Sequence, residues 1–215
     1  MTPQENLENV RARIAAACAR KKRSPDSVRL VAVTKERSLE QMKELAALGV
    51  RDFGENRVGE LEEKHGKLEG ITWHFIGNLQ SNKARRVAEL ADYVHSVASL
   101  KVAERLSKRC EELDRRLPVF LEVNMAREAT KQGLPREELP GLLNAARMLP
   151  GIKVIGLMTL APLGEPEKTR GAFHMLAEFA RSNGLPELSM GMTNDFEVAI
   201  EEGATLVRIG SALFK

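Results

Sequence analysis

Short apolar runs alternate regularly with amphipathic helical patterns along most of the chain, and this order limits the folds that the chain can adopt. Eight runs have the length and the β-branched content of buried strands, and a helical pattern separates each run from the next. The expected strands are residues 28–34, 50–54, 73–76, 92–96, 118–123, 152–157, 187–190 and 205–209. Because parallel strands are joined by helical crossovers, this alternation predicts an α/β fold, a (β/α)8 TIM barrel of parallel strands.

An open doubly wound sheet is the competing arrangement. It is disfavoured because no glycine-rich loop of the dinucleotide-binding type follows the first strand. At 215 residues with 43% hydrophobic content, the chain can bury one substantial core. We therefore expect a single domain over residues 1–215, with an added N-terminal helix that begins in a capping box formed by Thr2 and Glu5.

Composition argues against several classes of partner. Lys and Arg outnumber Asp and Glu by only 33 to 30, and no aromatic residues interleave with the basic run at residues 20–23, so we expect neither nucleic-acid nor membrane partners. Cys18 and Cys110 lack the spacing of a disulfide framework or a zinc site. No signal-peptide pattern or membrane-length apolar run is present, which predicts a cytoplasmic protein. No helix face is apolar beyond the needs of the core, which predicts a monomer.

Lys35 directly follows the first expected strand and so lies at the carboxyl end of the barrel, where barrel enzymes place their chemistry. Two interpretations are open at this point. The side chain can extend its ammonium group into water. Alternatively, burial can favour the neutral amine, which is the nucleophile required for a Schiff base.

The ends of the last two strands predict an anion site. Gly191 would allow close backbone approach, Thr193 or Asn194 could cap the following helix with Glu197 in a capping box, and Gly210 and Ser211 would add donors. Phosphate binding by these two loops recurs in TIM barrels. The alternative is that the same residues only cap a helix and form a turn.

Three further residues need an interpretation. Arg208 lies inside an apolar strand, so its guanidinium needs either a carboxylate or an electron-rich ligand atom. His74 stands between two aromatic residues and is either a core histidine or a site residue. Tyr93 begins the fourth expected strand, which places it at the bottom of the barrel and makes it a poor acid or base for chemistry at the mouth.

These residues fall within motifs that resemble those of the pyridoxal 5′-phosphate (PLP) homeostasis proteins, and the resemblance covers nearly the whole chain. The matching motifs are VAVTK at 31–35, FGENRV at 53–58, WHFIGNLQSNK at 73–83, EVN at 122–124, KQG at 131–133, GLMT at 156–159, LSMGM at 188–192 and VRIGS at 207–211.

The resemblance implies a barrel similar to the N-terminal domain of alanine racemase, with PLP held as a Schiff base on Lys35. It implies that Thr193, Gly210 and Ser211 bind the phosphate and that Arg208 faces the pyridine nitrogen. It places Asn56 beside the cofactor, with His74 and Met190 near it. Two departures from the family pattern are Thr193-Asn194, where serine is usual first, and Ala98, where aspartate is common.

The expected role follows from Arg208. A permanent cation disfavours protonation of the pyridine nitrogen and weakens the ring as an electron sink. The chain also ends at Lys215, before any second domain that could supply a base. We therefore expect a carrier in PLP and vitamin B6 homeostasis that is not an enzyme, with apoenzymes as candidate recipients. The alternatives are a weak PLP-dependent racemase or lyase and a Schiff-base aldolase that needs no cofactor.

Overall fold

The barrel strands are all parallel, as the alternation predicts. The computed structural model describes residues 2–125, 133–161 and 164–214. Its strands are β1 (Arg29–Val33), β2 (Asp52–Glu55), β3 (Thr72–Phe75), β4 (Tyr93–Val97), β5 (Leu117–Asn124), β6 (Leu134–Pro135), β7 (Ile152–Met158), β8 (Glu187–Met192) and β9 (Leu206–Ile209). Pairing runs in the order β4-β3-β2-β1-β9-β8-β7-β5, and pairing of β4 with β5 closes the ring. The predicted (β/α)8 barrel is confirmed for the part of the chain that the structure describes.

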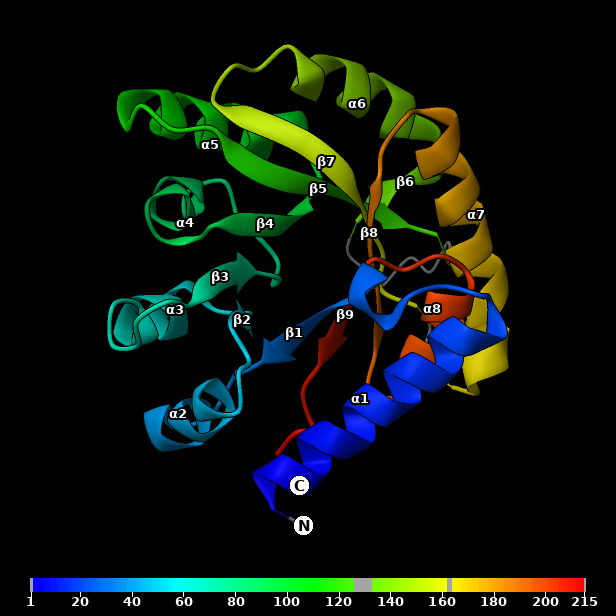
Figure 1. The fold of residues 1–215 in the computed structure, drawn as a ribbon. Coiled ribbons are helices and arrows are strands. Elements are labelled where there is room, and N and C mark those ends of the chain that lie inside the picture. Colours follow the sequence, from blue (N-terminus) through cyan, green and yellow to red (C-terminus); the bar gives the residue numbers. More distant parts are fainter. Residues whose placement is uncertain (1, 126–132, 162–163, 215) are drawn as a thin grey trace.

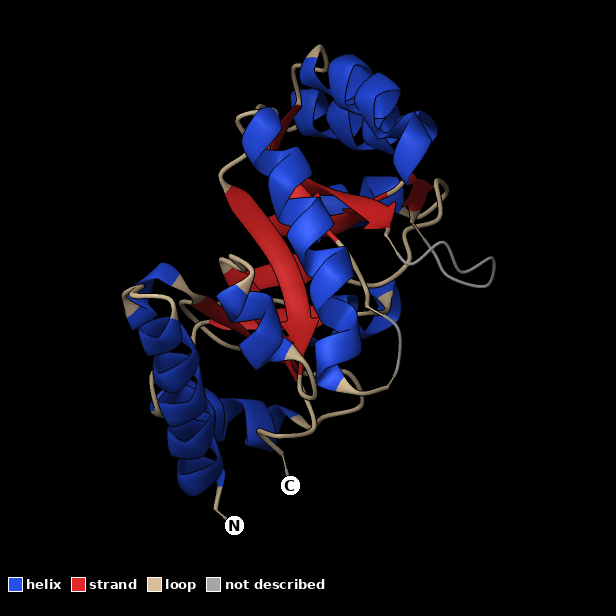
Figure 2. Cartoon of the chain, turned by 90° about the vertical axis from the view of Figure 1, so that its right-hand side faces the viewer, coloured by secondary structure: helices blue, strands red, loops and turns tan. Residues whose placement is uncertain are grey.

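Helices cover the outside of this ring. They are α1 (Pro3–Arg20), α2 (Leu39–Ala47), α3 (Val58–Lys64), α4 (Ala84–Leu90), α5 (Leu100–Glu112), α6 (Leu139–Arg147), α7 (Arg170–Ser182) and α8 (Phe196–Glu201). Figure 1 shows the strands around a common centre with the helices on the periphery. Figure 2 shows the same arrangement after a turn of 90° about the vertical axis. The added helix α1 lies outside the ring and packs mainly on α8 and α2.

Local signals explain where two of the helices begin. The side chains of Thr2 and Glu5 form the expected capping box at the start of α1, and Ser38 with Gln41 forms a second one at the start of α2. Gly49, with φ of +88°, directly follows the C-cap of α2 in a conformation that side chains other than glycine rarely adopt. The second capping box fixes the direction of the chain just after Lys35.

The core has two layers. A large outer layer packs the strands against the helices. A small inner cluster joins Val31, Phe120, Met158 and Leu206, with Tyr93 against it. These residues come from strands on different sides of the ring, so they meet inside the barrel and close its interior. Tyr93 begins β4, in agreement with its predicted place at the bottom of the barrel.

The structure differs from the predicted elements at several ends. β2 spans Asp52–Glu55 rather than 50–54, and β8 continues to Met192 rather than ending at 190. A two-residue strand, β6, pairs beside β5 and was not expected, and α6 begins at Leu139 after the 3-10 turn 136–138. Helix α3 ends at Lys64, where that side chain turns into the core. Of the motif residues quoted above, 131 and 132 lie outside the described part of the chain. None of the described helices is both long and apolar enough to cross a membrane.

Candidate functional site

The carboxyl ends of the strands surround a cavity of about 540 Å³. The described residues that line it are Val33, Lys35, Arg37, Asn56, Ile76, Leu160, Ala161, Gly164, Met192, Thr193, Asn194, Asp195, Arg208, Gly210 and Ser211. Six of the eight site residues expected from the sequence are among them: Lys35, Asn56, Thr193, Arg208, Gly210 and Ser211. The other two, His74 and Met190, are fully buried and do not line the cavity. The structure thus brings together residues that are far apart in the sequence.

Lys35 lies two residues beyond the end of β1, and its side chain is exposed at the cavity. The burial that we invoked from the sequence to favour its neutral form is therefore absent. The next residue, Glu36, has φ of +59°, a left-handed conformation that is uncommon for residues other than glycine. This turn takes the chain from the barrel strand into α2, so Lys35 stands at the rim of the cavity on a tightly bent segment.

Asn56 lies on the neighbouring loop, immediately after β2, the strand that pairs with β1. Its Oδ1 atom is buried and makes no hydrogen bond within the described residues. A Cβ atom on Gly77 would lie 2.0 Å from the carbonyl oxygen of Asn56, so only glycine allows this close approach of the two loops. A buried acceptor without a partner is unfavourable. Asn56 therefore presents an acceptor site that a ligand donor can fill.

The loop before α8 is built differently from the expected cap. The helix begins at Phe196 with Asp195 as N-cap, so the predicted cap by Thr193 or Asn194 is wrong. Asp195 instead accepts a hydrogen bond from the Met192 amide at 2.6 Å. The predicted capping role of Glu197 is also wrong, because this side chain forms an ion pair with Arg13 on α1. Thr193 and Asn194 consequently face the cavity and are not committed to the helix end.

Two glycines near this loop have different roles. Gly191 has φ of +92°, and a Cβ atom there would lie 2.6 Å from the Cβ of Ala199, so this glycine permits α8 to pack and does not line the cavity. Our expectation that Gly191 allows close approach to an anion is thus wrong. Gly210 does line the cavity, and a Cβ there would meet only Val33 at 3.5 Å. Together with Thr193 and Ser211, it forms a polar wall of hydroxyl and backbone groups.

Arg208 forms part of the cavity wall and is only 3% exposed. Its guanidinium donates one hydrogen bond to the Ser189 hydroxyl and another, of 2.9 Å, to the Thr159 carbonyl oxygen. Burial lowers the pKa of Arg208 to about 10, which still leaves it charged at neutral pH. No ion pair to Arg208 is formed among the described residues, so its charge is available to an electron-rich ligand atom.

Behind Arg208, a line of hydrogen bonds crosses the barrel interior. Ser189 Oγ lies 2.7 Å from His95 Nδ1, His95 Nε2 lies 2.9 Å from His74 Nδ1, and His74 Nε2 lies 2.9 Å from Asp52 Oδ1. We call Arg208, Ser189, His95, His74 and Asp52 the barrel relay. Its far end, Asp52, is the first residue of β2. His74 is thus a member of the interior network and stacks on Tyr93 with ring centroids 4.8 Å apart.

The chemistry of the donors fixes the direction of the barrel relay. A carboxylate only accepts, so His74 donates to Asp52 from Nε2. Burial lowers the pKa of both His74 and His95, which keeps both rings neutral with one proton each. His95 therefore donates to His74, and the Ser189 hydroxyl donates to His95 while accepting from Arg208. All the protons point away from Arg208, which fixes the guanidinium without neutralising its charge.

Sequence reasoning missed Glu122, a buried acid of β5. Burial raises its pKa to about 7, and the nearby charge of Arg208 opposes this rise. The alternation of side chains along β5 would have predicted that Glu122 points into the barrel, because alternate residues share a face and Phe120 lies in the inner cluster. The same alternation along β4 and β8 would have placed His95 and Ser189 inside the barrel.

The arrangement suits a small anionic ligand that carries an electrophilic carbon and an electron-rich atom. It offers a primary amine at Lys35, a polar wall at Thr193, Gly210 and Ser211, and a fixed cation at Arg208. No group of three or more potential metal ligands occurs within the described residues. The polar groups converge from separate strand ends on one cavity, as in other ligand sites of barrels.

Comparison with known proteins identifies the family. The family model for the N-terminal domain of alanine racemase matches residues 6–215. Pyridoxal phosphate homeostasis proteins from Pseudomonas aeruginosa and Aquifex aeolicus are 44% and 40% identical, over 99% and 100% of this chain and 95% and 98% of theirs.

Solved structures agree with this assignment. PipY of Synechococcus elongatus, whose structure contains bound PLP, is 38% identical with a TM-score of 0.82, covering 94% of this chain and 100% of its own. An alanine racemase from Clostridium difficile shares the fold at 15% identity with a TM-score of 0.76, over 99% of this chain and 56% of that enzyme. The chain therefore belongs to the alanine racemase N-terminal domain family and, within it, to the pyridoxal phosphate homeostasis proteins.

Proposed function

We propose that this protein holds PLP in the cavity as a Schiff base with Lys35 and acts as a cytoplasmic carrier in vitamin B6 homeostasis, without strong catalytic activity. The observation that carries the proposal is the convergence of Lys35, Arg208 and the polar wall of Thr193, Gly210 and Ser211 on one cavity. The PLP found in the related PipY structure supports it. PLP-dependent apoenzymes are the proposed recipients.

Each group has a defined task in this proposal. After it has lost a proton, the amine of Lys35 attacks the aldehyde carbon of the cofactor, a carbon–nitrogen double bond forms, and the aldehyde oxygen leaves as water. Thr193, Gly210 and Ser211 bind the phosphate, and Asn56 accepts a hydrogen bond through its unpartnered Oδ1 atom. Because the reaction is reversible, hydrolysis of the same bond releases the cofactor.

Arg208 supports a holding role. When bound, the cofactor supplies an aldehyde and a ring that can accept electrons. Arg208 remains a cation and is held by Ser189 and Thr159, so it disfavours a proton on the ring nitrogen and weakens electron withdrawal. The titratable side chains in the described lining are Lys35, Arg37, Asp195 and Arg208. Tyr93, the single tyrosine, begins β4 and is not among them.

The fold shared with alanine racemase favours a second candidate function, a weak PLP-dependent racemase or lyase. That activity requires a group that removes a proton from a bound amino acid. Asp195 is the carboxylate of the described lining, and its Oδ1 atom accepts from the Met192 amide. Measurable racemisation or elimination that is lost in Lys35→Ala would favour this second function.

A spectral titration tests the proposal. Addition of PLP to the purified protein is expected to produce the visible absorbance band of a Schiff base, and Lys35→Ala is expected to lack it. Lys43→Ala is a matched control, because Lys43 is an exposed lysine on the neighbouring helix α2. A colourless wild-type protein, or a band that persists in Lys35→Ala, would reject the proposal. A colourless protein that still cleaves aldols would instead favour an aldolase.

A further inference from the structure

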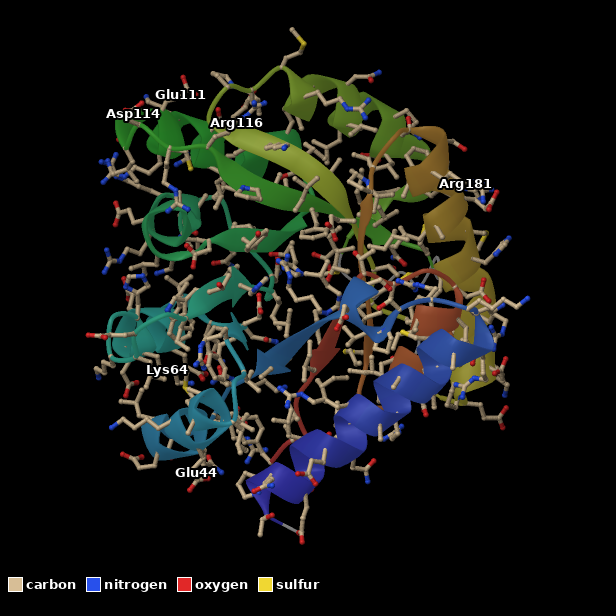
Figure 3. The ribbon with its side chains drawn as sticks, viewed as in Figure 1. Glu44, Lys64, Glu111, Asp114, Arg116 and Arg181 are labelled. Atoms are coloured by element: carbon tan, nitrogen blue, oxygen red, sulfur yellow. The ribbon has the colours of Figure 1, made fainter. Side chains whose placement is uncertain are left out.

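A second cluster of charged groups lies beside Lys35, outside the cavity lining. Its centre is Lys64, the last residue of α3, whose side chain is 6% exposed. Figure 3 shows Lys64 on this helix at the periphery of the barrel. The ammonium donates to the Thr34 carbonyl oxygen at 2.7 Å, to Glu55 Oε1 at 2.8 Å and to Glu60 Oε2 at 3.2 Å. These three bonds use all three ammonium protons.

The cluster holds the backbone on both sides of Lys35. On one side, Thr34 is held through its carbonyl by Lys64 and through its hydroxyl, which donates to Glu55 Oε1 at 2.6 Å. On the other side, the Glu36 amide donates to Glu60 Oε2 at 2.7 Å. Glu36 is the residue with φ of +59°. We call Lys64, Glu55 and Glu60 the Lys64 clamp, because it fixes the bent segment from which Lys35 projects.

Stability alone is a weak reason for such a cluster. Buried ion pairs often contribute no more than well-packed apolar residues of similar volume, because both charges lose their hydration. Glu55 is fully buried, and its Oε2 atom makes no hydrogen bond within the described residues. Burial accordingly raises the pKa of Glu55, against the opposing effects of Lys64 and Thr34. The geometry that the cluster imposes on the Lys35 segment is a better explanation for it.

We propose that Lys64 is a positioning residue: through the clamp, it fixes the backbone at Lys35 so that the Lys35 amine meets the aldehyde of the ligand in a reactive orientation. The inference rests on the proposed function, because it takes Lys35 as the amine that forms the Schiff base. Lys64 contacts the segment through the Thr34 carbonyl oxygen and does not line the cavity. Its loss should therefore impair bond formation while non-covalent binding in the cavity persists.

The experiment separates these two steps. Pyridoxine 5′-phosphate carries a hydroxymethyl group in place of the aldehyde, so its calorimetric affinity reports the cavity alone. The rate of Schiff-base formation with PLP reports the orientation of Lys35. For Lys64→Met we expect affinity for pyridoxine 5′-phosphate within about twofold of wild type and a rate at least about tenfold lower, because small misplacements of reacting groups are costly.

Two further variants make the test specific. Lys67→Met removes the same charge from an exposed position three residues away, so it should match wild type in both measurements. Glu60→Gln weakens the acceptor for the Glu36 amide and should slow the rate in the same direction, which retains the test if Lys64→Met does not fold. For Lys64→Met, the rate of Schiff-base formation should be measured as a function of pH from neutral to alkaline values. A positioning role predicts a lower maximal rate at high pH. A purely electrostatic effect on the Lys35 amine would only shift the pH at which the rate is half-maximal.

Several results would overturn the inference. A positioning role would be excluded by an unchanged rate of Schiff-base formation in Lys64→Met. It would also be excluded by a pH–rate profile with a shifted midpoint and a normal maximal rate, or by loss of pyridoxine 5′-phosphate binding together with the rate. Absence of a Schiff base in the wild-type protein is a different failure, because it rejects the proposed function and with it the role of the clamp.

Discussion

Replacement of Glu122 by glutamine should make the stability of the protein less dependent on pH. Glu122 is 3% exposed in β5, and the charged side chain that acts on it is Arg208. Burial raises its pKa from 4.5 to about 7, because the ionised carboxylate loses its hydration. Glutamine is neutral at all pH values and resembles the protonated acid in shape, so the substitution removes the titration and keeps the packing.

The sign follows from proton binding. Between 4.5 and about 7, the folded protein holds a proton on Glu122 that the unfolded chain has released, so the stability of the wild type falls as pH rises through this window. The pKa of Glu122 is about 7 in the folded protein and 4.5 in the unfolded chain. At about 1.4 kcal/mol per pKa unit, this difference lowers the free energy of unfolding by about 3 kcal/mol when the pH rises above both values. Glu122→Gln should therefore equal wild type near pH 4.5 and exceed it by up to about 3 kcal/mol above pH 7.

Urea unfolding of the PLP-free protein measures this difference, with the fluorescence of Trp73 as the signal. Trp73 is the single tryptophan and is 3% exposed in β3, so it reports loss of the barrel. PLP must be absent because a ligand that binds only the folded state adds its own stabilisation. Other carboxyl groups titrate in both proteins, and their effects cancel in the difference between the two curves.

Glu44→Gln is the matched control, because Glu44 is an exposed residue of α2 and lies on the outer side of the molecule in Figure 3. It should leave the free energy of unfolding unchanged across the same pH range. A pH-independent difference between Glu122→Gln and wild type, or a loss of stability that grows above pH 7, would refute the reasoning from burial.

Three further substitutions have expected effects on stability. His95→Phe should lower the free energy of unfolding by about 1–3 kcal/mol, measured by urea unfolding, because the hydroxyl of Ser189 and Nδ1 of His74 lose their buried partner; an unchanged stability would show that the barrel relay is not stabilising. Gly77→Ala should lower the melting temperature strongly and weaken PLP binding, since its Cβ would overlap the carbonyl oxygen of Asn56 at 2.0 Å. Gly59→Ala in α3, where a Cβ meets nothing within 4 Å, should raise the free energy of unfolding by up to about 1 kcal/mol. A Gly77→Ala protein that is more stable than Gly59→Ala would contradict the steric role of Gly77.

The strand pattern was predictable because barrel strands are buried on both faces and read as apolar runs between helical crossovers. Lys35 and Asn56 could be placed just after strands, and Arg208 within the last strand, by this pattern alone, and the barrel then brings these positions together. The identity of the ligand came from motif resemblance, since an amine, a cation and a polar wall do not specify PLP by themselves.

What the sequence did not predict depends on side-chain direction and on contacts distant in the chain. Nothing in the sequence distinguishes Lys64 from an ordinary lysine within a helix, and only the packing of α3 reveals that it reaches Thr34. Asp195 rather than Thr193 is the N-cap residue of α8, and its carboxylate accepts from the Met192 amide and makes no side-chain cap bond to the helix, which a run of polar residues in the sequence does not reveal. Lys35 proved exposed because β1 ends two residues before it.

Lys35 is the residue that we propose to carry the cofactor. The most direct measurement is borohydride reduction of the PLP-loaded protein, which converts a Schiff base into a stable amine, followed by digestion and mass analysis of the peptides. We expect the added mass of the reduced pyridoxyl phosphate on the peptide that contains Lys35. An adduct on a different lysine, or none after reduction, would contradict it.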